Sequence, residues 1–229
     1  MLYKETISNE LWELLQKLMN DEKLSDFMLV GGTALAMRLG HRLSIDIDLF
    51  TLKDFDAPGM FKYLEQEYGA QLVDSGLSNN TVLSYIGDIK VDILTHNYPL
   101  VSPFESVDGI RIISNDDIGA MKLHAICQSG ERYKDFVDMA FLLEQKPLKD
   151  YLDSYQYKYK QDPYWACIAL KTYDKILSFK GVGAFKEKDK SFKEIKEILD
   201  QALRNPLKKV ESKQHKELPK PNKKRGFRR

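Results

Sequence analysis

The fold of this chain is decided by residues 30–50, which read VGGTALAMRLGHRLSIDIDLF. The apolar run at 27–30 just before the glycine pair is typical of a short buried strand. Residues 33–39 have a helical composition that Gly40 brings to an end. Residues 46–51 begin by alternating acidic and apolar side chains, as in a strand with one functional face. The stretch therefore predicts a strand, a helix and a second strand in close succession.

Two acidic residues on the second predicted strand suggest a metal site. Asp46 and Asp48 are two positions apart, so their side chains project from the same face, while Ile47 and Leu49 turn into the core. Two carboxylates held this close resist ionising together unless a cation lies between them. Ligands that are all oxygen atoms favour Mg²⁺ or Mn²⁺ over zinc. We therefore predict that Asp46 and Asp48 are metal ligands, although such a pair on a surface strand can also be a solvated face.

The glycine pair is a candidate phosphate site. A strand that ends in Gly31 and Gly32 and leads into a helix places the backbone N–H groups of Gly31, Gly32 and Thr33 at the positive helix end. Glycine also permits a close approach of the ligand. Ser44 lies two residues before Asp46 and would point to the same acidic face, so it is a further candidate for phosphate contact. Taken alone, a Gly-Gly pair is more often a plain turn.

A third carboxylate follows on a later strand. Asp92 lies between Val91 and Ile93 on a segment that could pair beside the first acidic strand. Two-metal phosphoryl chemistry commonly uses three acids, with one ion at the attacking hydroxyl and the other at the triphosphate. We predict Asp92 as the third ligand, nearest the attacking oxygen and a candidate for its base. The alternative is an outward polar position in an alternating strand.

The remaining pattern divides the chain into a mixed α/β part at 1–113, a helical part at 114–206 that completes the active site, and a basic flexible tail at 207–229. We expect helices at 8–19, 56–68, 116–128, 133–144, 163–179 and 192–203, an aromatic-rich helical stretch around 151–159, strands at 70–74, 81–85 and 89–96, and a short edge strand at 110–113. Gly87 and Asp88 indicate a hairpin between the last two longer strands.

Charge is distributed unevenly. The tail carries ten Lys or Arg against two Glu, a net charge of +8, whereas the chain as a whole has 35 basic and 34 acidic residues and a net charge of +1. Such a basic end could anchor an RNA backbone, or it could be a solvated end without a ligand. The sequence shows neither a long apolar run nor a signal peptide, and its two cysteines suit no disulfide framework. We therefore expect a cytoplasmic protein that does not insert into a membrane.

The ordered pattern of a glycine pair, a helix, an Asp-x-Asp strand and a later single Asp resembles the polymerase-β-like nucleotidyltransferase superfamily. Residues 30–35 and 40–50 resemble its AbiEii/AbiGii branch, the nucleotidyltransferase toxins of bacterial abortive-infection and toxin–antitoxin systems, and the likeness extends over roughly residues 25–145. The resemblance implies an α+β fold: a mixed sheet with flanking helices, followed by a helical C-terminal half. It also implies transfer of an NMP from an NTP with Mg²⁺ or Mn²⁺. Because some relatives modify the acceptor end of tRNA, it implies an RNA acceptor and a cognate antitoxin as partners.

The resemblance also assigns roles to a second group of charges. Lys122 would face the nucleotide phosphates, and Asp135 would orient Lys122 through an ion pair. Arg132 or Lys134 would be another phosphate contact, and the roles of Arg132 and Asp138 stay open. Without the resemblance, charges at this helical spacing usually form a solvated face with modest ion pairs.

Other functions are compatible with the same residues. The acceptor could be a small hydroxylated molecule or a protein hydroxyl, because the motifs do not specify it. A nucleotide-binding module that has lost its chemistry is a third alternative. The sequence has neither of the glycine-rich nucleotide motifs Gly-x-x-x-x-Gly-Lys-Ser/Thr and Gly-x-Gly-x-x-Gly, so those phosphate-binding classes are disfavoured.

Overall fold

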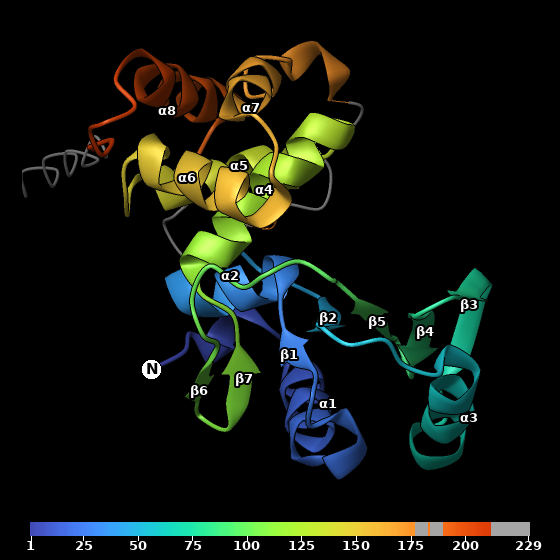
Figure 1. The fold of residues 1–229 in the computed structure, drawn as a ribbon. Helices are drawn as coiled ribbons and strands as arrows, with labels where there is room; N and C mark the ends of the chain where they lie inside the picture. The colour runs from blue at the N-terminus through green and yellow to red at the C-terminus, as the bar shows by residue number, and fades with distance from the viewer. Residues whose placement is uncertain (177–182, 184–189, 212–229) are drawn as a thin grey trace, which may run out of the picture.

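The computed structural model describes residues 1–176, 183 and 190–211, which form a mixed sheet covered by helices and a helical second half (Figure 1). The strands are β1 (Met28–Leu29), β2 (Asp46–Thr51), β3 (Gln71–Ser78), β4 (Thr81–Ile86), β5 (Ile89–Thr95), β6 (Glu105–Val107) and β7 (Ile110–Ile112). The α-helices are α1 (Asn9–Asn20), α2 (Gly31–Leu39), α3 (Ala57–Tyr68), α4 (Asn115–Gln128), α5 (Tyr133–Leu143), α6 (Leu148–Tyr159), α7 (Pro163–Ala169) and α8 (Phe192–Arg204), and short 3₁₀ turns are η1 (Lys4–Thr6), η2 (Glu22–Leu24) and η3 (Tyr173–Lys175). The α+β fold class predicted from the sequence is confirmed.

The seven strands have the order β3-β4-β5-β2-β1-β7-β6. β2 is parallel to β5 and antiparallel to β1, and β1 is parallel to β7. The predicted hairpin at Gly87 is present, because β4 and β5 pair antiparallel up to Ile86 and Ile89. β3 continues beyond the predicted end at residue 74, with a shift of register between Leu72 and Leu77.

The edge of the sheet differs from the prediction. The segment predicted as a short edge strand is β7, which lies inside the sheet between β1 and β6. β6, which was not predicted from the sequence, pairs antiparallel with β7 and forms the edge. Asp108 and Gly109 connect the two strands with φ angles of 52° and 80°. An Asp-Gly pair with positive φ at both residues is a strong hairpin signal, so this turn could have been predicted.

Helices α4–α8 form the second half of the described chain, and α2 lies between these helices and the sheet (Figure 1). α4 contacts α5, α6 and α7, and α2 contacts both α4 and α5. Three tyrosines of α6, Tyr151, Tyr155 and Tyr159, are buried, whereas Tyr157 is exposed. One face of the aromatic stretch around 151–159 therefore belongs to the core.

The helix predicted at 163–179 is shorter than expected. α7 ends at Ala169, and the 3₁₀ turn η3 follows at Tyr173–Lys175. The Thr172 hydroxyl donates a hydrogen bond of 2.7 Å to the Ala169 carbonyl, which competes with continuation of the helix. Residues 177–179 lie outside the described residues.

The start of the predicted tail is packed against the helices. Val210 is buried, and its N–H donates to the Leu143 carbonyl at 3.1 Å. The rest of the predicted flexible tail, residues 212–229, lies outside the described residues. Among the described residues, no helix combines the length and the apolar character that a bilayer crossing requires.

Candidate active site

The acidic residues of β2 and β5 lie side by side on one face of the sheet. The parallel register pairs Asp48 with Asp92 and Asp46 with Lys90. On β2 the alternate residues Ile47 and Leu49 are fully buried, so the acidic side chains project from the opposite face. The structure thus brings together the three carboxylates that the sequence singled out, across 46 positions between Asp46 and Asp92.

Asp48 is the electrostatically unfavourable member of this group. Burial raises the pKa of its carboxyl group to about 6, and the neighbouring charges of Asp92 and Asp46 act in the same direction. Lys122 and Lys90 lower that pKa and offset part of the effect. A carboxylate crowded by like charges in a half-buried site gains from a nearby cation.

Asp92 has one engaged and one free oxygen. Its Oδ2 accepts a hydrogen bond from the Lys90 ammonium, with which it forms an ion pair. Its Oδ1 is buried and has no hydrogen-bond partner among the described residues. A buried acceptor without a partner costs about 1–3 kcal/mol, so this oxygen marks a place where a ligand would stabilise the site. Lys90 was not predicted from the sequence, although its spacing of two from Asp92 places it on the same strand face.

The glycine pair holds the start of α2 against the acidic face. Gly31 has a φ of +69°, and a Cβ atom at this position would lie 2.3 Å from Asp48 Oδ2. At Gly32 an added Cβ would lie 2.3 Å from Arg42 Nη2. Both contacts exclude a larger residue without movement of these side chains, and the positive φ also favours glycine at position 31. α2 therefore begins beside Asp48, and the N–H groups of its first turn, which lack intrahelical acceptors, lie near this carboxylate.

Thr33 and Ser44 join α2 to β2. The Thr33 hydroxyl donates to the Asp46 carbonyl, and the Ser44 hydroxyl lies 2.9 Å from Thr33 Oγ1. Both residues are buried. These contacts fix the position of the acidic strand, whereas a contact of either hydroxyl with phosphate stays a prediction.

Asp138 is the centre of a buried charge network between the two halves of the chain. Arg42 donates to it through Nε at 2.7 Å and Nη2 at 3.1 Å, and His41 Nε2 lies 2.8 Å from Oδ1. Lys122 Nζ lies 2.7 Å from Asp138 Oδ2. Burial alone would raise the pKa of Asp138, but the charges of Lys122 and Arg42 and the hydrogen bonds of His41 and Arg42 hold that pKa well below its usual range. Arg42 was not singled out in the sequence, and no local pattern connects it with a residue 96 positions away.

Lys122 lies between two carboxylates. Its ammonium donates to Asp135 Oδ1 at 2.7 Å, so the ion pair predicted for these two residues is present. Only 7% of the Lys122 side chain is exposed, whereas 68% of the Arg132 side chain is exposed, with its Nε 3.6 Å from Asp135 Oδ2. Lys122 is thus a fixed, buried charge whose field reaches Asp48, and Arg132 is the more accessible cation. Phosphate contacts of both residues stay predictions.

The donor set suits a hard divalent cation. It consists of carboxylate oxygens, one of them buried without a partner among the described residues, and like-charge crowding adds to burial in raising the pKa of Asp48. In the part of the chain that the structure describes, no three His, Cys, Asp or Glu side chains are already gathered as a metal site. Instead, the Lys90 ammonium lies on Asp92.

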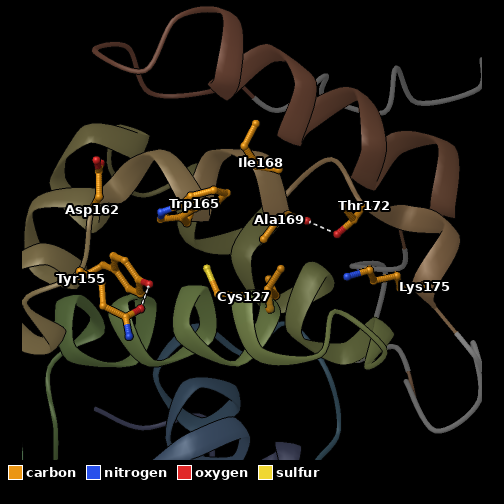
Figure 2. Close-up of a pocket in the computed structure, with 10 residues that line it drawn as sticks. Cys127, Tyr155, Asp162, Trp165, Ile168, Ala169, Thr172 and Lys175 are labelled. Atoms are coloured by element: carbon orange, nitrogen blue, oxygen red, sulfur yellow. Dashed lines mark hydrogen bonds between the residues drawn. The ribbon is translucent and has the colours of Figure 1, made fainter.

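A cavity elsewhere has a different character. It has a volume of about 550 Å³ and lies between α4, α6 and α7, where Cys127, Tyr155, Trp165 and Lys175 are among its lining residues (Figure 2). None of the predicted site residues lines it. We therefore place the candidate active site at the acidic face of the sheet.

Comparison with known proteins identifies the family of this chain. Residues 13–164 match the family model described as nucleotidyl transferase AbiEii toxin, Type IV TA system. The uncharacterized protein aq_aa25 of Aquifex aeolicus is 35% identical over 143 residues, which are 61% of this chain and 68% of that protein.

Two solved structures are also similar. A putative nucleotidyltransferase from Helicobacter pylori has 19% identity and a TM-score of 0.48, with 85% of this chain and 90% of that chain covered. The antibiotic-resistance factor ANT(2'')-Ia has 15% identity and a TM-score of 0.48, with 64% and 89% covered. The family match contains the glycine pair, all three carboxylates and the charge network, and it confirms the resemblance read from residues 30–50. Because that match spans more than half of the chain, this protein belongs to the AbiEii family of nucleotidyltransferase toxins.

Proposed function

We propose that this nucleotidyltransferase moves an NMP from an NTP to a hydroxyl group at an RNA end, the 3′ end of tRNA, with Mg²⁺ or Mn²⁺ held by Asp46, Asp48 and Asp92. The observation that carries the proposal is the register of β2 and β5, which sets Asp48 beside Asp92 on the face that also bears Asp46. Three carboxylates on one face provide the oxygen ligands that such ions prefer. When bound, a divalent ion in such a site polarises the phosphoryl oxygens and neutralises developing charge.

Asp92 is the general base that accepts the proton of the acceptor hydroxyl. The oxygen of the acceptor hydroxyl attacks the α-phosphorus of the NTP, the bond from that phosphorus to the bridging oxygen breaks, and pyrophosphate leaves. Asp92 Oδ1, which is buried and has no partner among the described residues, receives the hydroxyl proton. In the ligand-free protein the other oxygen of this carboxylate is paired with Lys90, which holds Asp92 in place.

The phosphates are bound by the start of α2 and by nearby cations. The N–H groups of Gly31, Gly32 and Thr33 provide donors at a positive helix end, with Ser44 beside Thr33. Lys122 stabilises charge as transfer proceeds, and Asp135 is the positioning residue that holds it 2.7 Å away. Arg132, with its exposed guanidinium, contacts the outer phosphates.

The acceptor is proposed from the family and from charge. Membership in a toxin family supports a target whose modification stops growth, with a cognate antitoxin as partner. The ten basic residues of 207–229 provide a sequence-independent attraction for an RNA backbone.

The test is label transfer from each α-labelled NTP, with Mg²⁺ or Mn²⁺, into purified total tRNA, total protein and a small-molecule extract. We expect label at the 3′ end of tRNA with the wild type and none with Asp48→Ala. Asp74→Ala is the matched control, because Asp74 is an exposed residue of β3 away from the acidic face. Label in protein or in the small-molecule fraction would reassign the acceptor, and label transfer by Asp48→Ala equal to wild type would contradict the mechanism.

A further inference from the structure

Lys90 is the one cation in direct contact with the carboxylates of the acidic face among the described residues. It stands opposite Asp46 in the register of β2 and β5, and its ammonium is paired with Asp92 Oδ2. The nearby buried cations form ion pairs with other carboxylates. Lys122 pairs with Asp135 and Asp138, and Arg42 pairs with Asp138.

Exposure distinguishes Lys90 from those fixed cations. Its side chain is 35% exposed, against 7% for Lys122 and 3% for Arg42. A long, partly solvated lysine side chain can leave its partner more easily than a buried one, because water solvates the released ammonium. Lys90 is therefore the cation that can move away from this cluster.

We infer that Lys90 is a resident counter-ion of the acidic face, one that competes with the divalent metal for Asp92 and gives way when metal and nucleotide arrive together. This inference rests on the proposed metal site. The physical reason is charge: a monovalent ammonium on Asp92 repels a divalent ion at the same carboxylate cluster, and it occupies Oδ2. The triphosphate of an incoming NTP offers the released ammonium a new anionic partner.

The arrangement therefore couples metal loading to the nucleotide. Without nucleotide, Lys90 neutralises part of the charge of Asp46, Asp48 and Asp92 and weakens metal binding. When nucleotide is bound, the ammonium moves to phosphate and no longer weakens metal binding. Lys90 acts as a positioning residue that makes metal binding depend on the nucleotide.

The test is Mn²⁺ binding to the nucleotide-free protein at pH 7.5, measured by titration calorimetry. We expect Lys90→Met to bind Mn²⁺ on the order of tenfold more tightly than wild type, since a like charge has been removed from the cluster. Lys90→Arg keeps the charge and should bind within about twofold of wild type. Lys62→Met, which removes an exposed lysine of α3, is the matched control and should change nothing. With a non-hydrolysable NTP analogue present, the advantage of Lys90→Met over wild type should shrink toward zero.

Equal or weaker Mn²⁺ binding by Lys90→Met, with Lys90→Gln as a second uncharged variant, would overturn the inference. Asp48→Asn separates this failure from failure of the proposed function. If wild type binds Mn²⁺ and Asp48→Asn does not, the metal site stands and only the role of Lys90 is rejected. If neither wild type nor Lys90→Met binds Mn²⁺, with both proteins folded by circular dichroism, the metal site and the role of Lys90 are rejected together.

Discussion

Asp48 of β2 and Asp92 of β5 are direct neighbours in a parallel strand pair, and their carboxylates share one face of the sheet. The neighbouring charge adds to burial in raising the pKa of Asp48 to about 6. Such an arrangement is unfavourable for folding and suitable for binding a cation, and it gives measurable consequences.

Replacing Asp48 by Asn should stabilise the metal-free protein while abolishing transfer. At pH 7.5 the Asp48 carboxylate of the wild type is ionised in surroundings that disfavour its charge. The shift of its pKa from 3.8 to about 6 corresponds to a destabilisation of about 1–2 kcal/mol after allowance for partial solvent exposure. Urea unfolding in the presence of a chelator measures the difference. Asp74→Asn on exposed β3 should leave the free energy of unfolding within about 0.5 kcal/mol of wild type. A destabilised Asp48→Asn protein would show that this carboxylate is structural.

The same pKa gives a pH dependence of stability. Because the folded pKa of Asp48 is raised above 3.8, the folded protein binds a proton between about pH 4 and 6 that the unfolded chain does not bind. The contribution of Asp48 to the free energy of unfolding therefore falls as pH rises through this window. The difference between wild type and Asp48→Asn across pH 4–8 isolates the effect, and a difference that is constant with pH would contradict the raised pKa.

Metal binding should have the opposite pH dependence. A proton on Asp48 competes with the cation, so Mn²⁺ affinity should fall as pH decreases below about 6. Titrations at pH 8, 7, 6 and 5.5 measure this change. Affinity that does not change between pH 7 and 5.5 would place the metal ligand elsewhere.

Gly31→Ala should move the Asp48 carboxylate. The added Cβ would lie 2.3 Å from Asp48 Oδ2 at a φ of +69°, whereas Gly69 has a φ of +68° and open space around its Cβ direction. Gly69→Ala therefore reports the backbone strain alone, about 1–2 kcal/mol. We expect both variants to lose that stability, and only Gly31→Ala to lose Mn²⁺ binding and transfer. Equal Mn²⁺ affinities for the two variants would show that Gly31 does not shape the site.

Asp138→Asn should be strongly destabilising. This fully buried carboxylate accepts hydrogen bonds from Arg42 and is paired with Lys122 and His41. Removal of its charge leaves the buried Arg42 guanidinium without its anion and leaves Lys122 with Asp135 alone. We expect a loss of about 3–5 kcal/mol in the free energy of unfolding. Asp116→Asn breaks a more exposed pair with Lys146 and should cost less than about 1 kcal/mol. Similar losses for both variants would argue against the network as the link between sheet and helices.

The sequence alone determined the local features of this protein. Alternation with a period of two fixed which side chains of β2 share a face, because a strand turns each successive residue to the other side. The Ser8 hydroxyl accepts a hydrogen bond from the Leu11 N–H at the start of α1, a local role that serine favours just before a helix. The ordered motif of residues 30–50 also indicated the family by itself, since the glycines and carboxylates that the chemistry requires lie close together in the sequence at fixed spacing.

Only the tertiary structure decided which distant residues meet. The strand order places β5 beside β2, where Lys90 joins the carboxylates, and the packing of α5 on α2 brings Asp138 to Arg42. The contact of Asp138 with Arg42 has no local signature, because packing depends on the summed burial of many side chains across the fold. Spacing alone places Asp46 beside Asp48 and Lys90 beside Asp92. Only the folded structure sets Lys90 opposite Asp46 and joins Arg42 to Asp138, which is 96 positions away.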